Sequence, residues 1–154
     1  FGIEGPSWLQ SSKWAMPAIV LASVWKDMGY FGLMLMSGLQ GINQEYYDAA
    51  AIDGAGKIKQ FTRITLPLLT PTLFFVLIIS LINSFQLFTQ IMIMTPDGGP
   101  LGSTMVMVER IYKCGFRYYE MGTAAAYSWI LFAILLLLTM VQMKLQNKWV
   151  NYDD

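Results

Sequence analysis

The chain has 154 residues, of which 55% are hydrophobic and only 13% are charged, and its ten basic residues balance its ten acidic ones. A mean hydropathy of +0.47 is high for a water-soluble domain of this length and places the chain in a lipid bilayer. Zero net charge without a basic run argues against a nucleic-acid partner. The sequence contains no histidine, the commonest general base and metal ligand, so we predict neither a catalytic nor a metal site.

The first apolar segment, about residues 14–40, is long enough to cross a bilayer core of about 30 Å as a helix. Lys26 and Asp27 fall near its middle. Neighbouring residues of a helix point about 100° apart, so these two side chains are not expected to pair simply. A charge at bilayer depth normally faces protein or water. Either both residues face an aqueous path, or the span is tilted and they lie nearer its outer end.

A polar segment at about residues 43–65 separates this span from the next. Residues 48–57 favour a short helix, because alanine has the best helix propensity and an acidic residue near the N-terminus suits the helix dipole. Gly54 and Gly56 weaken the end of this helix, and Pro67 suits the first turn of the following one. We therefore expect a helix lying across the membrane surface. The alternative is a plain interfacial helix in which the spacing of these residues is incidental.

The run from Gly54 to Lys57 resembles a phosphate-binding loop only superficially. Ala51 stands where that loop needs glycine, and Ile58 replaces the serine or threonine that would hold magnesium. Nucleotide binding by this chain is therefore not predicted.

The second span is expected at about residues 66–94, inside a stretch of 33 uncharged residues from Ile64 to Pro96. Within it, polar residues recur at helical spacing and share one face with two apolar neighbours. Such a face suits a sugar, whose hydroxyl groups need hydrogen-bond partners and whose CH face stacks on an aromatic ring. The alternative is hydrogen bonding between packed membrane helices. The candidate residues for lining a solute path through the membrane are Ser80, Asn83, Ser84, Leu87 and Phe88, with Tyr30 from the first span.

The loop at about residues 95–118 begins with turn residues, since Gly98 and Gly99 allow positive φ and Pro100 fixes its own φ. Met105–Tyr112 favours a short amphipathic helix with Glu109 and Arg110 in water, although an ordinary connecting loop fits as well. The third span is expected at about 119–145, where Met121–Met143 provides 23 uncharged residues.

Three spans place residues 43–65 and the C-terminus on one side of the membrane, and residues 1–13 and 95–118 on the other. Basic residues are more frequent in cytoplasmic loops, so the side that carries more of them is expected in the cytoplasm. That side is the one containing Asp48, which carries Lys57, Lys59, Arg63, Lys144 and Lys148, against Lys13, Arg110, Lys113 and Arg117 opposite.

The spacing of residues in the polar segment resembles the "EAA" signature of permease subunits of binding-protein-dependent ABC importers. Asp48 stands where that signature has glutamate, which keeps the charge and shortens the side chain by one methylene. Residues around the motif are similar to the sugar and glycerol-3-phosphate branch of the family. The matching positions are Asp48, Ala49, Ala50, Gly54, Ile64, Leu66 and Pro67, and the surrounding ones include Gly38-Leu39-Gln40, Thr95, Gly98-Gly99-Pro100 and Thr104.

This resemblance implies a partial type I ABC importer permease fold, all-α, with three transmembrane helices and a cytoplasmic coupling helix in one domain over residues 1–154. Family permeases have about twice as many spans, so the chain looks like a C-terminal half. The resemblance assigns docking to Asp48, Ala49, Ala50 and Gly54, and anchoring of the loop to Ile64, Leu66 and Pro67.

The resemblance also implies a multi-pass protein of the bacterial inner membrane that is not itself an enzyme. Its expected partners are a cytoplasmic ABC ATPase dimer, a second homologous permease subunit, an extracytoplasmic solute-binding protein, a sugar and membrane lipid. ATP and Mg²⁺ would be used by the ATPase, so this chain binds no cofactor. Two other functions stay open: a permease for a non-sugar solute, and a non-transporting membrane scaffold for an ATPase.

Overall fold

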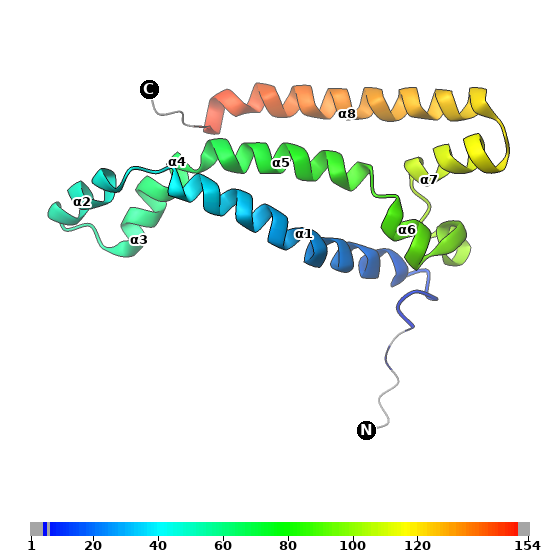
Figure 1. Cartoon of the computed structure of the whole chain (residues 1–154), viewed down its shortest axis with the longest axis horizontal. Helices are drawn as coiled ribbons and strands as arrows, with labels where there is room; N and C mark the ends of the chain where they lie inside the picture. The colour runs from blue at the N-terminus through cyan, green and yellow to red at the C-terminus, as the bar shows by residue number, and fades with distance from the viewer. Residues whose placement is uncertain (1–4, 6, 151–154) are drawn as a thin grey trace. The chain divides into compact units, whose positions relative to one another are not determined.

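The computed structural model describes residue 5 and residues 7–150, and every regular element among them is helical. Residues 1–4, 6 and 151–154, parts of the expected terminal segments, lie outside the described residues. The all-α fold expected from the sequence is therefore confirmed (Figure 1). Its α-helices are α1 (Ala15–Gln40), α2 (Gln44–Ile52), α3 (Lys57–Gln60), α4 (Leu66–Leu68), α5 (Thr70–Phe85), α6 (Thr89–Met94), α7 (Met107–Tyr112) and α8 (Met121–Trp149).

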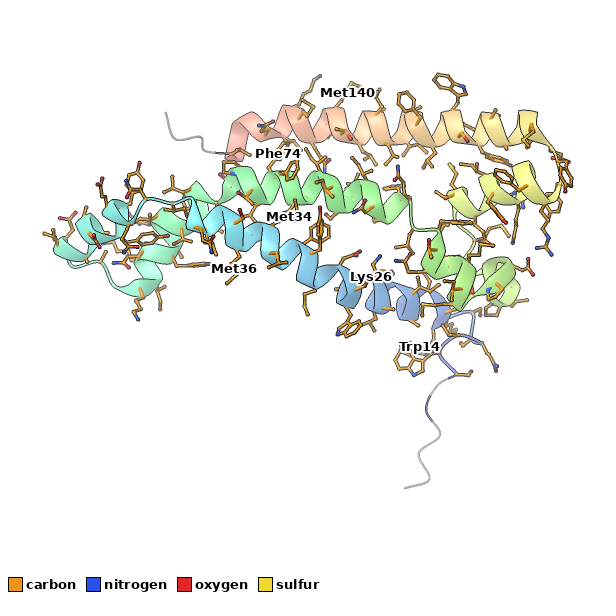
Figure 2. The ribbon with its side chains drawn as sticks, in the orientation of Figure 1. Trp14, Lys26, Met34, Met36, Phe74 and Met140 are labelled. Atoms are coloured by element: carbon orange, nitrogen blue, oxygen red, sulfur yellow. The ribbon has the colours of Figure 1, made fainter. Side chains whose placement is uncertain are left out.

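Two helices of the described part of the chain, α1 and α8, are long and apolar enough to cross a membrane. A third crossing is possible if Lys57–Leu68 and Thr70–Phe85, which meet at a bend of 60°, together form one broken span. Apolar side chains project freely from these helices, and Met140 on α8 is 50% exposed (Figure 2). Such surfaces suit contact with lipid or with other membrane helices.

The apolar segment at 66–94 does not form one continuous helix. The long helix α5 ends at Phe85, and the chain resumes helical structure only at Thr89. The N–H of Gln86 is shared between the carbonyls of Ile82 and Asn83, at 3.2 Å from each, a pattern common at helix ends. At about 1.5 Å per residue, the 16 residues of α5 are about 24 Å long, shorter than a bilayer core.

The chain forms two compact units. One contains residues 1–27 and 82–137, and the other contains residues 28–81 and 138–154. The polar segment at 43–65 lies wholly within the second unit, and the loop at 95–118 lies wholly within the first.

In the second unit, α1 approaches α5 closely at Gly38. A Cβ atom on Gly38 would lie 2.5 Å from Oγ1 and 2.9 Å from Cβ of Thr72, so only glycine fits without movement. Small residues allow such close approach of membrane helices, and van der Waals packing then stabilises their crossing.

In the first unit, the loop at 95–118 is built around buried hydroxyl groups. The Thr104 hydroxyl, fully buried, donates a hydrogen bond to Oγ1 of Thr95 over 2.8 Å. Gly99 has φ of +69°, and a Cβ there would lie 2.6 Å from Thr104 Oγ1. Both the left-handed backbone and the lack of space therefore favour glycine. The turn predicted around Gly98 and Gly99 is confirmed, since both have positive φ.

The predicted helix at Met105–Tyr112 is present as α7 and continues into a π-helical turn, Lys113–Arg117. The expectation that Glu109 lies in water was wrong, because this residue is only 3% exposed. Its Oε1 lies 2.8 Å from Nζ of Lys113, one turn further on, which is buried as well. Its Oε2 is buried without a hydrogen-bond partner among the described residues. Arg110 is exposed, as expected.

An exposed ion pair between Asp97 and Arg117 joins the two ends of this loop. The hydrogen bond from Arg117, and then its positive charge, hold the pKa of the Asp97 carboxyl below its ordinary value. The carboxylate of Asp97 is also 3.8 Å from Nζ of Lys113. Asp97 therefore links the exposed pair that it forms with Arg117 to the buried pair of Lys113 and Glu109.

Replacement of Gly38 by alanine is predicted to lower the thermal stability of the purified protein in detergent. Alanine favours a helix over glycine by about 0.5–1 kcal/mol, but overpacking against Thr72 costs about 1–3 kcal/mol. Gly32→Ala is the matched control, because it lies on the same helix and its Cβ would meet no described atom within 4 Å. Equal stabilisation of both variants would contradict the close approach.

Replacement of Lys113 by methionine is predicted to destabilise the loop by about 3–5 kcal/mol, because it leaves the buried carboxylate of Glu109 unpaired. The double variant with Glu109→Leu should regain most of this loss. Arg110→Met, on the exposed side of the same helix, should change the melting temperature little. A Lys113→Met protein as stable as the original would show that Glu109 is not held by this pair.

Candidate functional site

The polar segment at 43–65 starts with α2, which begins at Gln44, four residues before Asp48. Asn43 caps it, since its Oδ1 accepts a hydrogen bond from the Glu45 N–H over 3.1 Å. Asparagine is among the preferred residues at this position. The helix predicted over residues 48–57 is therefore present, but it starts four residues earlier, at Gln44, and ends at Ile52. Asn43 is the signal that the sequence analysis missed.

A glycine turn ends α2. The N–H of Ala55 donates to the carbonyl of Ala50 over 2.9 Å, and Gly54 has φ of +73°. This left-handed conformation is typical of the residue that follows a helix and favours glycine. A Cβ on Gly54 would meet no described atom within 4 Å. Glycine is therefore needed here for the backbone, and the chain turns into α3 (Figure 1).

The residues to which docking was assigned lie mostly on the surface of this turn. Asp48, Ala49 and Gly54 are exposed, and Ala50 is half-buried. The Asp48 carboxylate accepts a hydrogen bond from the Gln44 side chain over 3.4 Å, in an exposed position. The carboxylate therefore remains accessible to a partner.

Two large apolar side chains of the same turn are exposed and were missed by the sequence analysis. Ile52 is 87% exposed and Ile58 is 82% exposed. They flank Gly54, at the end of α2 and the start of α3. Isoleucines in a polar segment between apolar spans are the sequence signal that could have identified them.

The residues to which anchoring was assigned lie where the segment joins α5. Ile64 and Pro67 are half-buried, whereas Leu66 is 42% exposed. Ile64 belongs to a π-helical turn, Phe61–Thr65. The last residue of that turn, Thr65, is hydrogen-bonded to the Tyr47 hydroxyl on α2, with 2.8 Å between their oxygens. Neither member of this pair was predicted from the sequence.

A second candidate site is a hollow of about 260 Å³ within the first unit. Its lining is rich in side-chain amides, each of which can donate and accept hydrogen bonds. Lys26, labelled on α1 in Figure 2, contributes the only cation of this lining. The residues around the hollow are Lys26, Asp27, Asn83, Gln86, Leu87 and Gln90.

Lys26 and Asp27 form an ion pair of 3.2 Å. The expectation that these neighbours do not pair was wrong, because the flexible four-carbon stem of lysine lets its ammonium group reach back to the adjacent carboxylate. Both side chains line the polar hollow.

The predicted path residues are only partly brought together. Asn83 and Leu87 line the polar hollow. Ser84 lines a different, more apolar hollow of about 380 Å³ between α5, α7 and α8. The ring of Phe88 packs on that of Tyr112, with 5.0 Å between centroids. The end of α5 at Phe85 does not explain this division, because Asn83 and Ser84 are neighbours within α5 and Leu87, beyond its end, shares the hollow with Asn83. Neighbouring residues of a helix point about 100° apart, so Asn83 and Ser84 reach different hollows.

The two remaining path candidates belong to the other compact unit. The Ser80 hydroxyl donates to the carbonyl of Leu77 in its own helix over 3.0 Å. Tyr30 is 56% exposed and packs edge-to-face on Phe31. Neither side chain lines the hollow formed around Asn83.

Comparison with solved structures shows the same fold in a transporter chain. The match is to a chain in the crystal structure of a bacterial alginate ABC transporter in complex with alginate pentasaccharide-bound periplasmic protein, with a TM-score of 0.83 and 22% identity. The superposition covers 96% of this chain and 51% of that chain.

Comparison of sequences identifies relatives of about twice the length. The chain is 36% identical over 148 residues to the probable ABC transporter permease protein YesP of Bacillus subtilis, covering 96% of this chain and 48% of the relative. It is 37% identical to the sn-glycerol-3-phosphate transport system permease protein UgpA of Pectobacterium atrosepticum, covering 99% and 52%. It is 38% identical to the sulfoquinovosyl glycerol transport system permease protein SmoG of Agrobacterium fabrum, covering 94% and 46%.

The chain spans about half the length of the curated relatives that it matches. A family model described as binding-protein-dependent transport system inner membrane component matches residues 1–152. The expected resemblance is thereby confirmed, and the chain belongs to this family of inner membrane transport components.

Proposed function

We propose that this chain forms part of the permease of an ATP-driven importer and contributes to the path of a carbohydrate. In this proposal the segment at 43–65, which we call the coupling loop, docks on a cytoplasmic ATPase. The observation that carries the proposal is the exposed turn around Gly54, in which the EAA-type residues Asp48, Ala49 and Gly54 all face outward.

The apolar surface of the coupling loop supports docking on a protein. Ile52 and Ile58 lie on either side of Gly54 and are almost fully exposed. Burial of both side chains against a protein partner would be favourable, because it removes apolar surface from water. The small side chains between them allow the groove of a partner to approach the backbone closely, and the exposed Asp48 carboxylate offers one charge for orientation.

The polar hollow supports a path for hydroxylated solutes. Its amides, on Asn83, Gln86 and Gln90, offer both donors and acceptors. A sugar hydroxyl group can use both, because it donates one hydrogen bond and accepts others. The lining carries no net charge, because Lys26 is paired with Asp27. The names of relatives point to related solutes, since they include sn-glycerol-3-phosphate and sulfoquinovosyl glycerol.

The remaining components of such an importer lie on other polypeptides. We propose that an ATPase dimer uses ATP and Mg²⁺, that a second homologous permease subunit completes the path, and that an extracytoplasmic binding protein delivers the solute. The sequence of the coupling loop departs from a nucleotide-binding loop at Ala51 and Ile58, which agrees with ATP use elsewhere.

Replacement of Gly54 by aspartate is predicted to abolish co-purification of the ATPase and ATP-driven uptake, because it adds bulk and charge at the docking surface. Gly102→Asp is the matched control. Gly102 has φ of +71° and open surroundings like Gly54, but it lies in the loop at 95–118. The Gly102→Asp protein should therefore still co-purify with the ATPase. Normal association and coupling in the Gly54 variant would refute docking through this turn.

Replacement of Asn83 by leucine is predicted to lower carbohydrate uptake by the reconstituted importer roughly tenfold, because one or two hydrogen bonds of about 1 kcal/mol each are lost. ATPase association should not change. Ser80→Ala is the control within the same helix, because its hydroxyl bonds only the helix backbone among the contacts described. Equal uptake by the Asn83 variant and the original protein would exclude the hollow from the path.

A further inference from the structure

The coupling loop is closed by one hydrogen bond between its two ends. The hydroxyl oxygen of Tyr47, on α2, lies 2.8 Å from Oγ1 of Thr65, at the end of the π-helical turn. The two residues are 18 positions apart in the sequence. Thr65 is only 8% exposed and Tyr47 is half-buried, so the bond is partly shielded from competing water.

The position of α2 depends strongly on this bond. None of the nine residues of α2, all of which the structure describes, is buried. An isolated helix of this length is marginal in water. The other bonds of the loop are more local, such as that from the Gln60 side chain to the Ala55 carbonyl over 3.1 Å. Among the side-chain hydrogen bonds described for α2, that of the Tyr47 hydroxyl spans the longest sequence separation.

The far end of the bond lies next to the bend of the second apolar segment. Thr65 is followed directly by α4, and the arm Lys57–Leu68 meets Thr70–Phe85 at 60°. π-helical turns are rare and occur often at functional sites. A displacement of Thr65 thus acts on the arm that leads into α5, beyond which Gln86 lines the polar hollow.

We propose that the bond between Tyr47 and Thr65 is a strut that transmits movement of α2 to the bent arm, which makes both positioning residues for coupling. This inference rests on the proposed function. Tyr47 precedes Asp48, and neighbouring residues of a helix point about 100° apart. One side of α2 can therefore meet the ATPase at Asp48 while the other side holds Thr65.

The test uses the complete importer in lipid nanodiscs, with Gln86→Cys as a reporter and Cys114→Ser in the background. The rate of N-ethylmaleimide labelling at position 86 is compared without nucleotide and after trapping with ATP and vanadate. The variants are Tyr47→Phe, Thr65→Val and the two combined. Co-purification of the ATPase is measured on each sample.

Each single variant is expected to reduce the ATP-dependent change in labelling rate roughly three- to tenfold, the range for loss of one hydrogen bond. ATPase association should stay unchanged, a result that a general folding defect would not give. The combined variant should be no worse than the more severe single one, because both remove the same bond.

Two controls are matched to these variants. Tyr46→Phe removes the hydroxyl of an exposed neighbouring tyrosine. Thr62→Val removes a hydroxyl that bonds the carbonyls of Ile58 and Lys59 within its own helical segment. In both control variants, position 86 should show the same ATP-dependent change in labelling rate as in the reporter protein without further substitutions.

If the ATP-dependent change in labelling rate is undiminished in Tyr47→Phe, the strut is overturned and the proposed function stays intact. Loss of ATPase association in Tyr47→Phe also overturns it, because Tyr47 would then be a docking contact. If the reporter protein without further substitutions shows no ATP-dependent change, both the strut and the proposed function are overturned.

Discussion

The two ends of the coupling loop are joined by the hydrogen bond between the Tyr47 and Thr65 hydroxyls, on which we base the coupling of its first helix to the membrane segment. The helix α2 buries none of its residues and α3 has four residues, so neither is stable by itself. The Asn43 cap starts α2 and the left-handed Gly54 ends it. With both ends defined locally, one long-range bond is enough to connect the exposed turn to the segment that enters α5.

The break after α5 and the polar hollow occur at the same place for one physical reason. Backbone groups in lipid must be hydrogen-bonded internally, so irregular backbone at membrane depth is found only where it is buried in protein or lines a watery cavity. The chain is non-helical between Phe85 and Thr89. Gln86 and Leu87 of this interval, with Asn83 and Gln90 beside it, line the hollow. The ion pair of Lys26 and Asp27 also lines the hollow.

The properties that follow from local sequence were predictable. Long apolar segments predicted the helices α1 and α8, although α1 contains Lys26 and Asp27, and glycines predicted the turns at Gly54 and Gly99, where φ is positive. The break at Gln86 was not predictable from hydropathy, because a run of uncharged residues looks the same whether its helix is continuous or interrupted. The division of the predicted polar face between two hollows depends on tertiary packing, because Asn83 and Ser84 are neighbours in one uninterrupted helix.

Two other kinds of contact were also not predicted: contacts between residues far apart in the sequence, and contacts made by flexible side chains. The burial of Glu109 depends on its pairing with Lys113 and on the packing of the whole loop, so its charge alone suggested exposure. The pairing of Lys26 with Asp27 depends on the conformation of a long lysine side chain. The bond of Tyr47 with Thr65 joins residues 18 apart, and no periodic pattern marks either of them.

The most direct test of the account is the labelling of Ile52→Cys by a membrane-impermeant maleimide in a Cys114→Ser background. Ile52 is 87% exposed at the tip of the coupling loop, and Leu101, 97% exposed in the loop at 95–118, serves for comparison. We predict that position 52 reacts only in inside-out vesicles and is protected when the ATPase is bound, whereas Leu101→Cys reacts only in intact spheroplasts. Labelling of position 52 from outside, or without protection by the ATPase, would contradict the coupling role.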